Sequence, residues 1–260
     1  MTSRDERRTP VVAVVSPKGG IGKTVVAANL AAALSSRMPS ALIDLDLYCG
    51  DVEWAFGLHP TYRMHDVTRR LREDASADIA AMFTPYDETL SMLCAPDSHI
   101  AADDVIASDV AAMARQLLTL ERPLVYDTSP GMSDFALDAL EWATHMVLVT
   151  TTDVSSVQAA RKLLDTTATL RLEHAETVLV LNRSTTRTGL SATDIERRLG
   201  MNTSLRIPDS RHVAEALNSG CPIVKTHPES HIAGDFVALA DSMLGGEPPA
   251  RDGFWRRFTS

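Results

Sequence analysis

The residues with the clearest chemical potential form the segment Ser-Pro-Lys-Gly-Gly-Ile-Gly-Lys-Thr, residues 16–24. Its glycines allow backbone N–H groups to approach phosphate oxygens, because no Cβ atom stands in the way. Lys23 is placed to neutralise the β- and γ-phosphates of a nucleotide, and the Thr24 hydroxyl to ligate Mg²⁺. The segment follows an apolar run and opens a helical pattern, which is the context that a phosphate-binding loop (P-loop) requires. We therefore expect a nucleotide site here rather than an incidental glycine-rich turn.

Carboxylates at the ends of two other apolar runs could serve the same site. Residues 41–45 contain Asp44 and lead into Asp46, and the run Pro-Leu-Val-Tyr ends at Asp127. Ligands of α/β proteins bind at the carboxyl ends of the strands. Asp127 has the form of a Walker B acid that holds Mg²⁺ through a water, and residues 128–131 have the form of a switch loop that senses the γ-phosphate. The alternative for Asp127 is a turn or helix-cap residue.

The elements that must position these residues alternate along the chain. Short apolar or β-branched runs predict strands at residues 11–16, 41–45, 89–95, 123–127, 146–150 and 177–181. Helical spacing of apolar residues predicts helices over residues 24–36, 101–120, 133–142, 154–172 and 191–199. Such alternation predicts an α/β fold with a doubly wound, mostly parallel sheet and helices on both of its faces.

The length and composition fit a single domain of an intracellular protein. We expect an extension at residues 1–10, a domain at 11–244, and a Gly/Pro-rich link with an aromatic and arginine-rich tail at 245–260. The three cysteines and eight histidines show no metal-ligand spacing, so they carry no metal prediction. The charged N-terminus does not resemble a signal peptide, and no run is long and apolar enough to span a membrane. We expect a cytoplasmic protein, with a peripheral position at the inner membrane face or a cell pole as the alternative.

The P-loop departs from the pattern GxxxxGK[ST], because Pro17 stands where the first glycine belongs. The remaining KGGxGKT resembles the deviant P-loop of the ParA/MinD family of ATPases, and the resemblance extends over about residues 11–244. It implies a P-loop NTPase fold of the SIMIBI type, ATP and Mg²⁺ as ligands, weak partner-stimulated hydrolysis, and an ATP-dependent homodimer. It also implies that Lys18 is a signature lysine that reaches the phosphates bound to the partner subunit.

The same resemblance assigns roles to individual residues. It implies Asp46 as the catalytic residue, acting with Lys18 and Lys23, although Asp46 could instead be a structural switch residue. It implies that Thr24, Asp44 and Asp127 surround the magnesium ion. The phosphates would be bound by Lys18, Gly19, Gly20, Ile21, Gly22, Lys23, Thr24 and Val25, and the base by Asn182, Arg183, Pro208 and Asp209. Asn182 could also be an ordinary turn residue after a strand.

Within the family, the pattern DLDLxxGDVxxxxGL at residues 44–58 resembles the CpaE/TadZ branch, which helps to localise pilus-assembly secretion machinery. This implies a protein partner in a pilus, secretion or polar complex. Many members of that branch carry a receiver-like domain before the ATPase, where this chain has only residues 1–10. A second departure is Val25, where the family often has Thr or Ser.

Other functions remain open from the sequence. A ParA-like DNA-partition ATPase would bind DNA through a patch drawn from Arg187, Arg197, Arg198 and Arg211, but the net charge of −9 argues mildly against DNA binding. A MinD-like or flagellar-number regulator would contact a membrane weakly through the tail at 251–258. A scaffold without ATPase activity would have no need for the complete set of P-loop and acidic residues. Metabolic ligases and iron–sulfur carriers of related fold would need signatures that the chain lacks.

Overall fold

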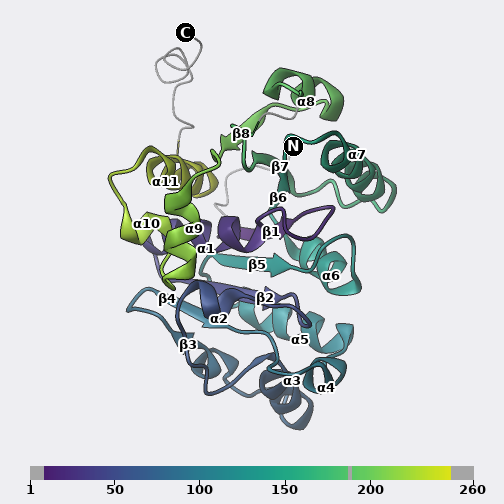
Figure 1. The fold of residues 1–260 in the computed structure, drawn as a ribbon. Coiled ribbons are helices and arrows are strands. Elements are labelled where there is room, and N and C mark those ends of the chain that lie inside the picture. The colour runs from purple at the N-terminus through teal and green to yellow at the C-terminus, as the bar shows by residue number, and fades with distance from the viewer. Residues whose placement is uncertain (1–8, 187–188, 247–260) are drawn as a thin grey trace.

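The computed structural model describes residues 9–186 and 189–246 (Figure 1). Within these residues, eight strands form one sheet in the order β3-β4-β2-β5-β1-β6-β7-β8. Neighbouring strands are parallel, except that β3 runs antiparallel to β4 at one edge. The strands are β1 (Val11–Val15), β2 (Ser40–Leu45), β3 (Thr84–Pro85), β4 (Leu90–Leu93), β5 (Leu124–Thr128), β6 (His145–Thr150), β7 (Glu176–Leu181) and β8 (Thr203–Arg206).

Helices cover both faces of the sheet. One face packs against α1 (Lys23–Ser35), α2 (Val52–Ala55), α9 (Arg211–Asn218), α10 (Ile223–Thr226) and α11 (His231–Met243). The other packs against α3 (Met64–Glu73), the 3₁₀ helix η1 (Ile79–Met82), α4 (His99–Asp103), α5 (Ala107–Leu118), α6 (Asp134–Trp142), α7 (Val154–Thr169) and α8 (Ala192–Leu199). The predicted doubly wound α/β fold is therefore confirmed.

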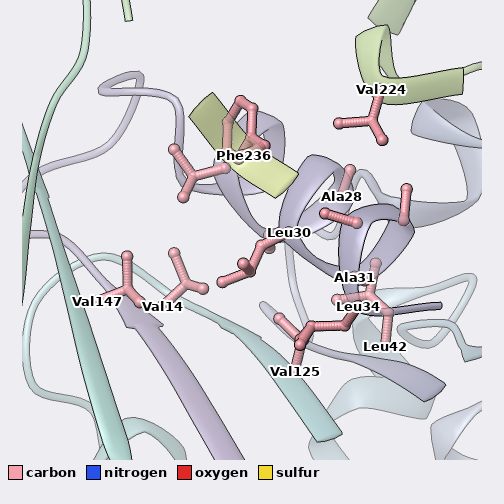
Figure 2. Close-up of a cluster of buried hydrophobic side chains, with 14 of the residues drawn as sticks. Val14, Ala28, Leu30, Ala31, Leu34, Leu42, Val125, Val147, Val224 and Phe236 are labelled. Atoms are coloured by element: carbon pink, nitrogen blue, oxygen red, sulfur yellow. The ribbon is translucent and has the colours of Figure 1, made fainter. Parts of the chain in front are cut away.

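The core is built from the alternation of side chains along each buried strand. Val12 and Val14 of β1 point to the face covered by α1, while Ala13 of the same strand points to the opposite face. Figure 2 shows Leu30 of α1 between the sheet and Phe236 of α11. Because α1 is enclosed by the sheet on one side and by α10 and α11 on the other, it is apolar around most of its circumference. This enclosure fixes the P-loop, which ends at the first turn of α1.

The six predicted strands are present as β1, β2, β4, β5, β6 and β7, each within a few residues of its expected limits. The prediction of one helix over residues 101–120 is wrong, because the chain forms α4 and α5 with an extended residue, Ile106, between them. The Arg72 guanidinium bonds to both Asp104 and Asp109, and Asp109 also accepts from the Ile106 N–H. These tertiary contacts start a new helix where periodicity alone would continue the first.

No helix among the described residues is long and apolar enough to cross a membrane. The predicted tail at 251–258 lies outside the described residues, as do Arg187 and most of the predicted N-terminal extension.

Candidate nucleotide-binding site

The P-loop connects β1 to α1 at the carboxyl edge of the central strand. The chain reverses through Gly20 and Gly22, whose φ angles of 72° and 100° fall in the left-handed region that side chains disfavour. The Ser16 hydroxyl donates to the Lys18 carbonyl at 2.7 Å, and the Gly131 N–H donates to the Ser16 carbonyl at 2.8 Å. The predicted switch loop, residues 128–131, is thus tied directly to the start of the P-loop.

Asn182, at the end of β7, holds the middle of the P-loop. Its side chain is buried and its amide donates to the Ile21 carbonyl at 2.7 Å, while its carbonyl oxygen accepts from the Arg183 N–H at 2.9 Å. The amide lies so close to Gly22 that a Cβ atom at that position would collide with it. The structure therefore places Asn182 against the P-loop backbone, a contact that no pattern in the sequence predicts.

Asp127 lies at the end of β5, adjacent to both β1 and β2. Its carboxylate is buried, and neither oxygen makes a well-aligned hydrogen bond to a described residue, although the nearby Thr24 hydroxyl and Lys23 ammonium lower its pKa. Burial outweighs both and raises the pKa of Asp127 to about 7. Two orphaned carboxylate oxygens beside a threonine hydroxyl and a lysine fit a divalent cation, because an oxygen-rich, negatively charged pocket is the environment that Mg²⁺ prefers.

Asp44 and Asp46 lie at the carboxyl end of β2, the strand next to β5, and their surroundings differ. Asp44 is buried next to Asp127 in the sheet, and its two oxygens accept from the N–H groups of Asp46 and Val52 at 3.1 and 3.2 Å. Burial first, and the Asp127 charge second, raise the pKa of Asp44 well above its usual range. Asp46 is half-buried; burial raises its pKa, while the Lys23 ammonium lowers it. Asp44 therefore holds the loop after β2, and Asp46 lies within electrostatic reach of Lys23.

Lys18 points across the P-loop toward the start of α7. Its ammonium donates to the Ser155 hydroxyl at 2.6 Å, and Ser155 in turn donates to Asp153 at 2.7 Å. Asp153 caps α7 by accepting from the Ser156 N–H, and its several hydroxyl and N–H donors hold its pKa far below the usual range. The sequence predicted a helix from residue 154, so this cap could have been found, but its contact with Lys18 could not.

The remaining predicted base-contact residues gather near the ends of β7 and β8. Arg183 is exposed and adopts a left-handed φ of 51°, and Asp209 is exposed with its N–H donating to the Thr185 hydroxyl. The Ser184 N–H donates to the Ile207 carbonyl, which holds the two loops together. Arg183, Pro208 and Asp209 thus lie on joined loops, and Asn182 links them to the P-loop.

Comparison with known proteins is consistent with this geometry. The family profile described as the CobQ/CobB/MinD/ParA nucleotide binding domain matches residues 12–223, which is most of the chain. The chain belongs to this family. Among characterised relatives, the septum site-determining protein MinD of Thermotoga maritima is 27% identical over 253 residues, covering 94% of this chain and 91% of that protein.

Solved structures of the CobQ/CobB/MinD/ParA family share the fold. A ParA family ATPase from Chlorobium tepidum superposes with a TM-score of 0.81 at 23% identity, covering 89% of this chain and 98% of that one. MinD from Pyrococcus horikoshii, solved with Mg-ADP, superposes with a TM-score of 0.79 at 22% identity, covering 90% and 95%. The predicted ParA/MinD resemblance is confirmed, while the CpaE/TadZ branch stays a prediction.

Proposed function

We propose that this chain is an ATP-dependent molecular switch that dimerises when it holds Mg-ATP, hydrolyses ATP slowly, and positions a cellular complex. The observation that carries the proposal is the buried Asp127 carboxylate, which has two unsatisfied oxygens beside Lys23 and Thr24 at the mouth of a P-loop. A purely structural carboxylate would be paired, because an unpaired buried charge is costly. Asp127 therefore fits a role in which its two oxygens bind a cation.

The phosphates would lie against the backbone N–H groups of residues 19–24 and the Lys23 ammonium, at the N-terminus of α1. Thr24 and Asp127 would hold Mg²⁺, which supplies positive charge against the β- and γ-phosphates. Asp44 supports this shell indirectly, since both of its oxygens already accept backbone N–H groups. Val25 leaves the Thr24 hydroxyl in place, so its departure from the family pattern does not remove a magnesium ligand.

Asp46 is the group best placed to orient the attacking water. It is half-buried on the loop beyond β2, and the Lys23 ammonium is close enough to lower its pKa. Lys18 would act between subunits: it must leave Ser155 and extend toward the phosphates held by the partner subunit. Hydrolysis would then remove the γ-phosphate that Lys18 contacts and reopen the dimer.

The proposed cargo is pilus or secretion machinery, and its support is the CpaE/TadZ-like pattern at residues 44–58. The first glycine of this pattern, Gly50, lies where a Cβ atom would collide with Asp44 and Ala95. The pattern therefore corresponds to a close approach in the fold, which argues that its residues form a defined surface rather than a free loop.

The test is oligomeric state by light scattering with Mg-ATP, with Mg-ADP and without nucleotide, using Asp46→Ala to suppress hydrolysis. We expect a dimer with Mg-ATP alone. A monomer in all three conditions, with ATP binding confirmed by calorimetry, would contradict the switch. A dimer in all three would mean that nucleotide controls something other than association.

The 27% identity to MinD over 94% of this chain favours one second candidate, a membrane-associated regulator. ATP-dependent binding to anionic vesicles that disappears when residues 247–260 are removed would support it.

A DNA-partition role has weaker support, because Arg197 of the predicted patch is ion-paired with Asp194 at 3.2 Å. Salt-sensitive, ATP-dependent DNA binding would revive that role.

A further inference from the structure

A cavity of about 410 Å³ lies outside the phosphate site, beyond the carboxyl ends of β2 and β4. We call it the aromatic–acidic pocket, and its principal lining residues are Tyr48, Asp51, Glu53, Trp54, Arg63 and Asp97. Trp54 and Tyr48 are 71% and 52% exposed, which is unusual for large aromatic side chains in a folded domain. The site as proposed above gives neither aromatic residue a role.

Two carboxylates of the pocket are free. Asp51 and Asp97 are exposed, and within the described part of the chain neither carboxylate takes part in a hydrogen bond or an ion pair. Arg63 is the one cation among the described residues that line the pocket, and it is already engaged: it pairs with Glu53 at 2.5 Å and donates to the Ala95 carbonyl at 3.1 Å. The pocket therefore presents two unbalanced negative charges next to exposed aromatic rings.

The Tyr48 ring is held by its own contacts, whereas Trp54 is positioned through its helix. The Tyr48 hydroxyl donates to Asp103 of α4 at 2.6 Å, and the Tyr48 ring packs edge-on against His99 with centroids 5.8 Å apart. Trp54 lies on α2, which begins where the Val52 N–H donates to Asp44. A fixed ring such as that of Tyr48 loses little conformational entropy when a ligand binds, so it suits recognition.

We propose that the aromatic–acidic pocket is a docking site for an arginine side chain on an exposed segment of a protein partner. A guanidinium group stacks on Trp or Tyr faces and forms bidentate bonds to carboxylates, so it satisfies both features of the pocket at once. An anionic lipid surface or a nucleic acid is excluded by charge, because the free groups of the pocket are carboxylates.

Residues 48–51 line the pocket and belong to the same loop as Asp46. Gly50 packs against Asp44 and Ala95 without room for a Cβ atom, and Asp44 bonds to the N–H groups of both Asp46 and Val52. A partner arginine between Asp51 and Asp97 would tie the end of this loop to the segment that follows β4. This consequence rests on the proposed function: the docked partner would change the rate of ATP turnover through the position of Asp46.

The test uses the full chain and two probes, the peptide acetyl-Gly-Leu-Arg-Leu-Gly-amide and its citrulline analogue, which has the same shape without the charge. Binding is followed by the NMR signal of the Trp54 indole, assigned with Trp54→Phe. We expect the arginine peptide to bind about tenfold more tightly than the citrulline peptide. In the double variant Asp51→Asn, Asp97→Asn this preference should fall to nearly one, whereas the control Glu73→Gln, at the exposed last position of α3, should keep it.

Equal binding of the two peptides, or a preference that survives in the double variant, would overturn the proposal. Binding that appears only after removal of residues 247–260 would also overturn it, because this chain's own tail would then be the occupant. Arginine-specific binding with unchanged ATP turnover would support the docking site and overturn only its coupling to Asp46. Loss of ATP binding is measured separately, so a failure of the proposed switch is distinguishable from a failure of the pocket.

Discussion

The P-loop and the loop that follows β2 flank the same carboxylate, Asp127, but different kinds of contact hold them. The P-loop is fixed from outside, by Asn182 on one side and by the switch-loop Gly131 on the other. The loop after β2 is held mainly by Asp44 of its own strand, with one further bond from the Tyr48 hydroxyl to Asp103, and it presents Asp51 and the Tyr48 ring to solvent. If the proposed function is right, the P-loop is a rigid binding loop for phosphates, and the loop after β2 is a surface that a second molecule can move.

The largest effect on stability and ATP binding should come from a substitution in the P-loop. Gly22→Ala places a Cβ atom against the Asn182 amide at a φ of 100°, so both strain and collision oppose the native loop. We expect a loss of about 3 kcal/mol in the free energy of unfolding and no detectable ATP binding. Gly20→Ala is the matched control, since its φ is also left-handed but no atom lies within 4 Å of its Cβ. Denaturant unfolding of the two variants measures the difference, and equal losses would refute the rigid contact.

A substitution in the loop after β2 should have a smaller effect on stability and on ATP binding. Gly50→Ala places a Cβ atom against the buried Asp44 and Ala95, and the loop can move away from them because Tyr48 and Cys49 before it are exposed. We expect a loss of about 2 kcal/mol in unfolding free energy, slower ATP turnover and retained ATP binding. Gly234→Ala in α11 is the control, because its Cβ meets nothing within 4 Å and alanine favours the helix. If Gly50→Ala abolished ATP binding, the proposed division between the two loops would be wrong.

Asp127, between the two loops, gives a pH-dependent test. Burial raises the pKa of Asp127 to about 7, so the folded state holds its proton more tightly than the unfolded state. The free energy of unfolding without nucleotide should therefore fall as the pH rises from about 4 through 7. Asp127→Asn should raise that free energy by about 2 kcal/mol at pH 8 and very little at pH 5, while it abolishes Mg²⁺-dependent ATP binding. Thermal unfolding at both pH values measures this, and a gain that is equal at pH 5 and 8 would contradict it.

The smallest expected effect is that of Asn182→Ala, and it distinguishes two possible roles of Asn182. Its amide bonds to the Ile21 carbonyl of the P-loop, whereas the family resemblance predicts contact with adenine. Asn182→Ala should weaken ATP binding by about tenfold through the loosened loop. If the loop contact is its main role, GTP binding should weaken by the same factor. A loss confined to ATP, measured by calorimetry, would assign Asn182 to base recognition instead.

Much of the fold followed from local pattern. The strands that carry the site, β1, β2, β5 and β7, were predictable because buried parallel strands are short, apolar and β-branched. The break between α4 and α5 was not, because it depends on Arg72 of a different helix. The short helix α2 was also missed, since it is fixed by a hydrogen bond from Val52 to Asp44 rather than by its own propensity.

The sequence by itself determined which groups could bind phosphate and magnesium, because the P-loop chemistry lies in one contiguous segment and Asp127 ends a recognisable strand. Only the tertiary structure decided which of those groups are already satisfied. Asn182 reaches Ile21 across 161 residues and Lys18 reaches Ser155 across 137, whereas both oxygens of Asp127 lack an aligned hydrogen bond. The reason is physical: hydrogen bonding and burial depend on how distant elements pack, and no local pattern encodes that packing.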